Sequence, residues 1–404
     1  MKGGALTVNS IDVRTDKNAT ISTNLTVNNN GTITLNNGKV LNVQGSVTLR
    51  GITTLKLNGN YRNGTKLVTG TNGLETGTVK LVYDPEFMLE EIGNSLVLTL
   101  RFQPEVAAPV AQGNWGIATA SRAFVDTVRG QRNNTGCIAN GRGTTWFSVL
   151  GASNNLDGAD ISIEGAAVGA DYKLGRRSLM GIALGYTEGK VSPTGLGKVN
   201  QDGYYAAVYG EHGLTSPNRE NKLSVDWVLA YGSTESQHGD MNWEQDSLQL
   251  NSRLTWSRPV NKRLTTNAFV GMEYFATASD TVEGVKTGSI QNLRAEVGIG
   301  AGYVLWGSPS PIHNKTGQPM GNGCEKLVLH GELSYFNDLV RQNPIIRMNG
   351  ASGESTNPGR NGVEAEIGAT YRINERWSTS ANYSFSAMED STEHRVNVGA
   401  AWSF

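Results

Sequence analysis

From about residue 144 to the end, the chain alternates apolar and polar residues over long runs. Near the end, Trp377, Thr379, Ala381, Tyr383 and Phe385 fall on one side of an extended strand, and serine and asparagine residues lie between them. A period of two is typical of a β-strand with one apolar face. The pattern predicts about twelve antiparallel strands, near 144–151, 161–173, 178–190, 199–212, 222–235, 242–257, 263–277, 287–306, 326–340, 361–373, 376–389 and 392–404.

The length and composition of these runs favour a closed membrane barrel over a soluble sandwich. Many exceed ten residues, whereas strands of globular proteins have about 5–6 residues and tilted membrane strands about 9–11. The polar faces mix both charges with Gly, Ser and Asn, as a wet lumen would. Closure also removes the strand edges that lipid cannot satisfy. Aromatic residues lie toward the ends of the apolar faces, where interfacial girdles are expected: Tyr172, Tyr231, Trp256, Tyr303, Trp306, Tyr371, Trp377 and Trp402.

Residues 1–102 have a different pattern, with short alternating stretches separated by Gly and Asn turns. Short strands at intervals of roughly 8–10 residues suit a β-solenoid, in which successive rungs stack side by side. A fragment of a β-sandwich is the alternative, and the shortness of the repeats favours the solenoid. The predicted strands are 19–27, 31–35, 40–43, 46–49 and 54–57.

One helix is predicted between the two strand-rich regions. Residues 103–109, which include two prolines, are expected to form a linker, and Asn114 is expected to cap a helix that ends before Gly130. About 16 residues would give a rod of roughly 24 Å, close to the apolar band of about 25 Å in an outer-membrane barrel. The helix is therefore expected to thread the lumen. Its predicted lumen residues are Ile117, Arg122, Phe124, Asp126, Val128 and Arg129.

Composition and charge narrow the range of functions. The 50 Gly and 11 Pro residues suit strands and turns more than helices. With 35 Lys and Arg against 36 Asp and Glu, no nucleic-acid partner is expected. A run of 18 apolar residues is missing, so no transmembrane helix is expected. The first residues lack the apolar segment of a signal peptide, which predicts that the chain is a truncated or engineered piece of a longer precursor, or that its start is misplaced.

The histidines give little support for an enzyme. His330 and Glu332 share one strand face and could pair in the lumen. A structural role is favoured for this pair over acid–base chemistry. His238 and Asp240, near a predicted outer loop, weakly resemble the His and acidic residues of outer-membrane barrel proteases. That family differs in strand number and lacks a threaded helix. The five histidines are at positions 212, 238, 313, 330 and 394. Their spacing does not match that of metal ligands, so neither a metal nor a cofactor is expected.

The order of solenoid strands, linker, helix and alternating strands resembles the autotransporter family of type V secretion. The final strand resembles the C-terminal signal read by the barrel-assembly machinery, through Val396, Val398, Trp402 and Phe404. Residues 57–70 resemble the passenger segment that precedes such barrels. The resemblance implies an all-β fold with an antiparallel barrel of about 12 strands and a threaded helix. It divides the chain into the end of a β-solenoid passenger (1–102), a linker and lumen helix (103–143) and an outer-membrane translocator barrel (144–404).

The resemblance implies secretion rather than catalysis. The chain is expected to lie in the bacterial outer membrane and to export and anchor its own passenger at the cell surface. Implied partners are outer-membrane lipid, the barrel-assembly machinery and periplasmic chaperones, and a monomer is expected. A barrel protease, and a porin or adhesin barrel with an N-terminal binding module, remain alternatives. The charged helix residues Arg122, Asp126 and Arg129 are expected to face the lumen wall, where a solvated side chain is favoured over an ion pair for any single residue. The lumen groups that they would face include Glu364, Glu366, Glu296, Glu273 and Asp226.

Two further hypotheses concern the connection between helix and barrel. Some autotransporters release the passenger at an Asn-Asn pair inside the lumen helix, but Asn133 and Asn134 follow the predicted helix, so a turn is preferred over cleavage. With the chain end in the periplasm, strand direction places Cys137 and Cys324 on that same oxidising side. A Cys137–Cys324 disulfide is hypothesised, which requires Cα atoms within about 7 Å. Two free thiols are the alternative.

Overall fold

A computed structural model describes most of the chain in two compact units, with the boundary between residues 103 and 104. Each unit is described by itself. The described residues are 5–14, 17–62, 64–84, 87–100, 104–132, 143–156, 158–175, 177–216, 221–278, 281–282, 285–286, 288–307, 325–343, 345–348, 351–354, 359–374 and 376–404.

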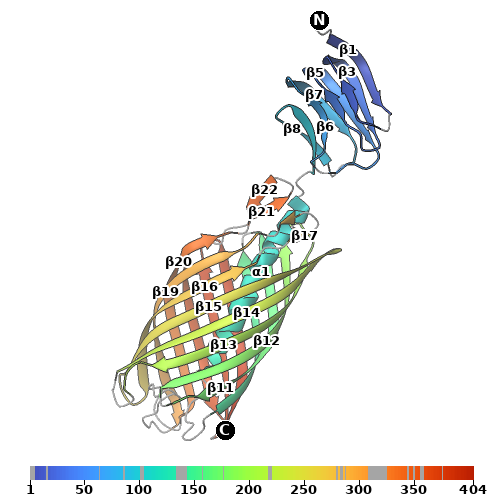
Figure 1. The fold of residues 1–404 in the computed structure, drawn as a ribbon. Helices are drawn as coiled ribbons and strands as arrows, with labels where there is room; N and C mark the ends of the chain where they lie inside the picture. Colours follow the sequence, from blue (N-terminus) through green and yellow to red (C-terminus); the bar gives the residue numbers. More distant parts are fainter. Residues whose placement is uncertain are drawn as a thin grey trace. The chain divides into compact units, whose positions relative to one another are not determined.

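The first unit is a short β-solenoid with two sheets (Figure 1). One sheet is parallel, in the order β1 (Ala5–Val13), β3 (Asn24–Asn36), β5 (Val47–Asn58) and β7 (Leu74–Val82). The other joins parallel strands to an antiparallel hairpin, in the order β2 (Ala19–Ile21), β4 (Leu41–Val43), β6 (Lys66–Gly70), β9 (Ser95–Leu100) and β8 (Phe87–Ile92). The solenoid prediction is confirmed.

Stacked identical positions hold the solenoid rungs together. Leu25 lies opposite Val47 on the next rung, and both side chains are buried. Asn58 donates a hydrogen bond of 2.8 Å to Asn36, 22 residues earlier, and Asn36 donates one of 2.9 Å to Asp12. Alternate apolar residues therefore fill the core, while polar residues form ladders on the outside.

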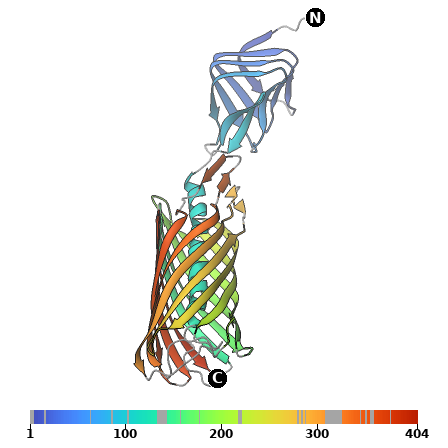
Figure 2. The same cartoon turned by 90° about the vertical axis from the view of Figure 1, so that its left-hand side faces the viewer.

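The second unit contains a closed barrel of twelve antiparallel strands (Figures 1 and 2). Consecutive strands pair, and the last strand pairs back with the first. Each predicted run overlaps one strand, so the barrel prediction is confirmed. The strands are β10 (Gly143–Leu156), β11 (Ala159–Lys173), β12 (Ser178–Pro193), β13 (Val199–Gly213), β14 (Lys222–His238), β15 (Met241–Pro259), β16 (Leu264–Thr277), β19 (Gln291–Gly307), β20 (Glu325–Gln342), β23 (Asn361–Arg372), β24 (Trp377–Met388) and β25 (Ser391–Ser403).

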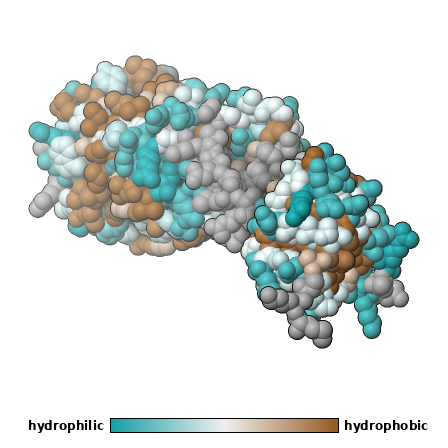
Figure 3. Space-filling view, turned by 90° about the horizontal axis from the view of Figure 1, so that it is seen from above, coloured by the Kyte–Doolittle hydropathy of each residue, from teal (hydrophilic) through white to brown (hydrophobic). Residues whose placement is uncertain are grey.

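The barrel wall is apolar outside and polar inside. Ile182 and Ile367 are 63% and 64% exposed, although such side chains are normally buried. Figure 3 shows apolar side chains gathered on the outer wall. Inward positions instead hold buried charged groups such as Glu393 and Arg395. This inside-out arrangement suits lipid around the wall and water-compatible chemistry within it.

Outward aromatic residues gather near the end of the barrel where β25 ends, which we call the C-terminal end. Trp306 stacks on Tyr371 with ring centroids 6.4 Å apart, and Trp402 lies 5.1 Å from Phe404. We call this group the C-terminal belt: Tyr172, Trp256, Tyr303, Trp306, Tyr371, Trp377 and Trp402. Tyr231 lies nearer the other end, as do Tyr186 and Tyr204, whose rings are 5.1 Å apart.

Most of helix α1 (Pro104–Arg132) lies inside the barrel (Figure 2), and the helix is longer than expected, with 29 residues and a length of roughly 43 Å. The linker prediction at 103–109 is wrong from Pro104 onward, and Asn114 is buried within the helix rather than capping it. Pro104 is tolerated because the first helical residue needs no N–H partner. Pro109 does lose a helical hydrogen bond, but Ala107 and Val110 around it are buried.

Two barrel connections add a small four-stranded sheet. Its strands are β17 (Thr281–Val282), β18 (Val285–Lys286), β21 (Ile345–Met348) and β22 (Ala351–Glu354), in that order. Across the residues that the structure describes, no helix is both long enough and apolar enough to span a membrane.

Candidate functional site: the lumen helix and the wall that holds it

Helix α1 packs chiefly against β10 to β14 and against β25, so it lies along one side of the lumen wall. Ile117, Phe124 and Val128 are completely buried on this side. Their spacings of seven and four residues place them on one helix face. These predicted lumen residues therefore form the apolar part of the contact.

Phe124 occupies a space that glycine provides. Its ring stacks on Tyr205 with centroids 5.3 Å apart. A Cβ atom at Gly185 would lie only 2.6 Å from the Phe124 ring, well inside van der Waals contact. Any larger residue at that wall position would push the helix away.

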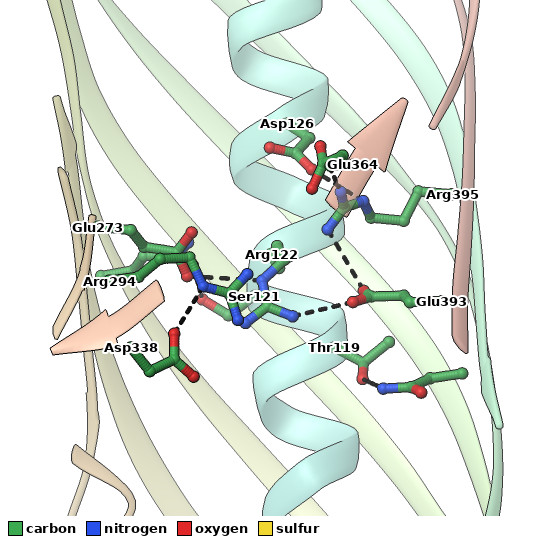
Figure 4. Close-up of polar contacts among 12 residues, drawn as sticks. Thr119, Ser121, Arg122, Asp126, Glu273, Arg294, Asp338, Glu364, Glu393 and Arg395 are labelled. Carbon is green, nitrogen blue, oxygen red and sulfur yellow. Dashed lines mark hydrogen bonds and ion pairs between the residues drawn. The ribbon is translucent and has the colours of Figure 1, made fainter. Parts of the chain in front are cut away.

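The charged part of the contact begins at Arg122 (Figure 4). Its Nη1 donates to Glu393 Oε2 at 2.9 Å, and its Nε lies 3.5 Å from Glu273 Oε1. The Arg122 side chain is 11% exposed and that of Glu393 is fully buried. The helix cation is therefore held between carboxylates from β25 and β16, because an unpaired charge there would be costly.

Arg395 makes the reciprocal contact from the wall (Figure 4). Its Nε lies 3.0 Å from Asp126 on the helix, and its Nη2 lies 2.8 Å from Glu364 on β23. A third carboxylate, Glu393, lies 3.5 Å from its Nη1 and joins it to Arg122. We call this group the lumen network: Arg122, Asp126, Glu273, Glu364, Glu393 and Arg395.

A second ion pair lies close to the lumen network. Arg294 Nε on β19 donates to Asp338 on β20 at 2.8 Å, and its guanidinium lies 3.9 Å from the Phe336 ring centroid. Arg341 lies 3.4 Å from the same carboxylate and 5.3 Å from the ring of Trp115 on the helix. Arg341 therefore connects the wall opposite the packed side to Trp115 in the N-terminal half of the helix.

Uncharged hydrogen bonds accompany the helix along its length. Ser121 donates to Gln249 at 2.7 Å, and Gln201 donates to the Gly113 carbonyl at 2.8 Å. Farther apart on the helix, Gln112 donates to the Gly158 carbonyl at 3.1 Å and Gln131 to Ser380 at 3.4 Å. The helix is thus held by polar contacts as well as by its apolar face, and water could replace the polar contacts if the helix moved.

The lumen acids expected to face the helix have different partners. Glu273 contacts Arg122 directly, and Glu364 reaches the helix only by way of Arg395. Arg129 is half-buried and forms no ion pair with any residue in the described part of the chain. The other acids lie on the wall: Glu296 is 3.6 Å from Arg253, Glu366 is 3.8 Å from His330, and Asp226 lies opposite Arg253 in register.

Sequence reasoning missed the two central wall residues, Glu393 and Arg395. Both lie on β25, whose outward residues resemble an assembly signal. Alternation along that strand places Glu393 and Arg395 inward, opposite Val396 and Val398. The signal was therefore present, since a closed barrel turns every second residue of each strand into the lumen.

The residues of the expected assembly signal lie on the outer wall at the closing seam. Val396, Val398 and Phe404 are about half exposed. Residue 404 exchanges two backbone hydrogen bonds with Gly143, of 3.2 and 3.1 Å. A Cβ atom at Gly143 would lie 2.5 Å from the Phe404 ring. The aromatic ring therefore covers the point where β10 and β25 meet.

His330 and His238 have polar neighbours on the barrel wall. His330 contacts Asn382 at 2.9 Å, while Glu332 pairs with Arg253 at 2.6 Å, so they have separate partners. His238 lies 3.1 Å from the Lys198 carbonyl. In the described ranges, no cluster of three or more His, Cys, Asp or Glu residues could hold a metal ion. Four residues of the earlier hypotheses lie outside the described residues: Asn133, Asn134, Cys137 and Cys324.

A closed barrel with an apolar outer wall and a helix in its lumen defines a translocator of the bacterial outer membrane. Residues 142–384 match the family model of the autotransporter beta-domain, and the chain belongs to this family. No curated protein sequence matches the chain.

Autotransporter domains are among the solved structures that resemble this chain. The transport unit of AIDA-I from Escherichia coli has a TM-score of 0.51 at 12% identity, covering 75% of this chain and 100% of that structure. The translocator domain of NalP from Neisseria meningitidis has a TM-score of 0.49 at 14% identity, covering 73% and 100%. At such identities the likeness concerns the fold alone.

Proposed function

We propose that this translocator exports the polypeptide ahead of its barrel and then anchors that passenger at the cell surface. The observation that carries the proposal is the helix in the lumen, which follows the solenoid directly in sequence: β9 ends at Leu100 and α1 begins at Pro104. A passenger that leaves through the barrel and stays attached to it must keep its last segment inside the lumen. The lumen network then gives the last segment a defined resting place.

Folding of the solenoid outside the cell biases transit outward. Each rung adds buried leucine and valine side chains to the core, and burial of one such side chain contributes about 1.5–3 kcal/mol. Once folded outside, a rung would resist return through the lumen. Neither ATP nor a second domain is needed for this bias.

We further infer that the barrel-assembly machinery and periplasmic chaperones deliver the barrel, that it works as a monomer in outer-membrane lipid, and that it is not an enzyme. All twelve barrel strands come from one chain, which supports the monomer. The outward Val396, Val398, Trp402 and Phe404 support recognition of β25 during assembly.

An epitope tag tests the proposal in cells. The full chain behind a secretory signal peptide would carry the tag after Asn72, an exposed solenoid turn, or after Gly175, an exposed barrel turn at the C-terminal end. Antibody should bind the Asn72 tag on intact cells, and the Gly175 tag only after permeabilisation. A folded barrel in the membrane with the Asn72 tag inaccessible from outside would contradict export.

A further inference from the structure

Exposed Lys and Arg side chains gather at the C-terminal end of the barrel. They lie in or beside the connections β11–β12, β15–β16 and β23–β24. Within the described residues, none of them forms an ion pair with a carboxylate. We call this group the basic collar: Arg177, Arg258, Lys262, Arg263 and Arg376.

The basic collar borders the C-terminal belt. Arg258 follows Trp256 by two residues, and both are exposed on the outer face of β15. Arg263 donates to the Val304 carbonyl at 3.3 Å and the Leu305 carbonyl at 3.4 Å, beside Trp306.

Another collar residue, Arg376, directly precedes Trp377 of the belt. Its carbonyl accepts the Ser403 N–H at 2.9 Å, next to Trp402. Because outward aromatic residues mark the membrane–water interface, these cations lie at the level of the lipid headgroups.

The opposite end of the same wall carries the opposite charge. Glu164, Glu188, Asp202, Glu235 and Glu244 are exposed and are direct cross-strand neighbours from β11 to β15. The chain as a whole has a formal net charge of −1. The basic collar is therefore a local feature of one end and does not follow from the overall composition.

We propose that the basic collar binds anionic phospholipid headgroups, such as phosphatidylglycerol, in the leaflet around the C-terminal end of the barrel. Guanidinium groups match phosphate oxygens in a bidentate geometry. A net negative headgroup attracts each cation, whereas the ammonium of a zwitterionic headgroup offsets the attraction of its phosphate. Attraction to an anionic surface is worth about fivefold in affinity for each Lys or Arg. The leaflet is the periplasmic one in the orientation expected for this family.

The test uses the full chain in nanodiscs of phosphatidylcholine mixed with phosphatidylglycerol. The lipid that remains bound after mild detergent extraction is quantified. In the collar variant, Arg258→Gln, Lys262→Gln and Arg263→Gln are combined. The matched control neutralises two exposed cations at the other end, Lys190→Gln and Lys198→Gln.

Selective retention of phosphatidylglycerol should fall about fivefold for each collar residue neutralised, and the control should match the parent chain. Arg258→Lys with Arg263→Lys should retain most of the binding, because the charges remain although the bidentate geometry is lost. Equal retention by the collar variant and the parent overturns the proposal, as does an equal loss in the control. Displacement of the lipid by millimolar inorganic phosphate would assign the collar to free phosphate instead. If the combined variant fails to fold, Lys262→Gln alone should still show its fivefold loss.

Discussion

Replacing Arg395 by methionine should destabilise the barrel more than any exposed substitution. The Arg395 side chain is 4% exposed and lies within 3.5 Å of Asp126, Glu364 and Glu393. Methionine keeps much of the volume but leaves three carboxylates without this partner. Removing one member of a buried ion pair costs about 3–5 kcal/mol. Glu393 keeps Arg122 as a partner, so we expect a loss of about 3 kcal/mol in the free energy of unfolding.

Equilibrium unfolding of the full chain in detergent micelles measures this loss, with tryptophan fluorescence as the signal and guanidinium chloride as the denaturant. Lys190→Met is the matched control, because Lys190 is exposed on the outer face of β12. Its effect should stay within about 0.5 kcal/mol. The slope against denaturant should be the same for both variants, since the same surface unfolds.

A rescue variant separates charge from packing. Arg395→Met combined with Asp126→Asn and Glu364→Gln removes two of the unpaired carboxylates together with their partner. Most of the lost stability should return, because replacing a whole buried ion cluster by uncharged groups changes the free energy of unfolding only slightly. A loss below about 1 kcal/mol for Arg395→Met would refute the reasoning. Strict additivity of the three substitutions would refute it equally.

Four further predictions follow from the helix, the wall and the seam. Deleting α1 should raise ion conductance through the reconstituted barrel, and equal conductance would place the helix outside the conducting path. Gly185→Leu should cost about 1–3 kcal/mol by overpacking against the helix, whereas Gly175→Leu, with open space around it, should cost less than about 0.5 kcal/mol. Phe404→Asp should reduce the amount of heat-modifiable barrel in outer membranes, and an unchanged yield would remove the ring from the assembly signal. Non-reducing peptide mapping should recover a Cys137–Cys324 disulfide, and free alkylation of both thiols would end that hypothesis.

The barrel was predictable from sequence because its strands repeat one simple rule. Alternation with a period of two placed residues such as Ile367 and Tyr383 outward, and both are exposed. The solenoid was predictable for a related reason, since its short strands alternate in the same way. In both cases each local pattern agrees with the global fold.

The start of the helix was not predictable from the same kind of pattern. Pro104 and Pro109 signal a break in an exposed segment, but residues such as Ala107 and Val110 are buried. Burial on all sides stabilises a helix that its own sequence would not. Intrinsic propensity therefore placed the beginning of the helix too late.

The partners within the lumen were only partly predictable. Alternation indicates which side chains point inward, but it does not indicate the stagger between strands that are far apart in sequence. Arg122 contacts Glu393, 271 residues later, only because β25 closes the barrel beside β10. Whether Arg122 pairs with Glu273 and Glu393 or with other lumen acids such as Glu296 and Glu366 depends on the axial position of the helix in the barrel. Composition does not encode that position.

The close fit between glycines and opposing side chains has a consequence for how such proteins can be recombined. The wall accepts Phe124 at Gly185 and Gln131 at Gly399, while the helix accepts Gln201 at Gly116. The sequence of the helix and the sequence of the wall therefore constrain each other. In a translocator assembled from the helix of one relative and the barrel of another, side chains would clash at positions where the fit requires glycine. Passengers can be exchanged upstream of Pro104, but helix and wall should be inherited as one module.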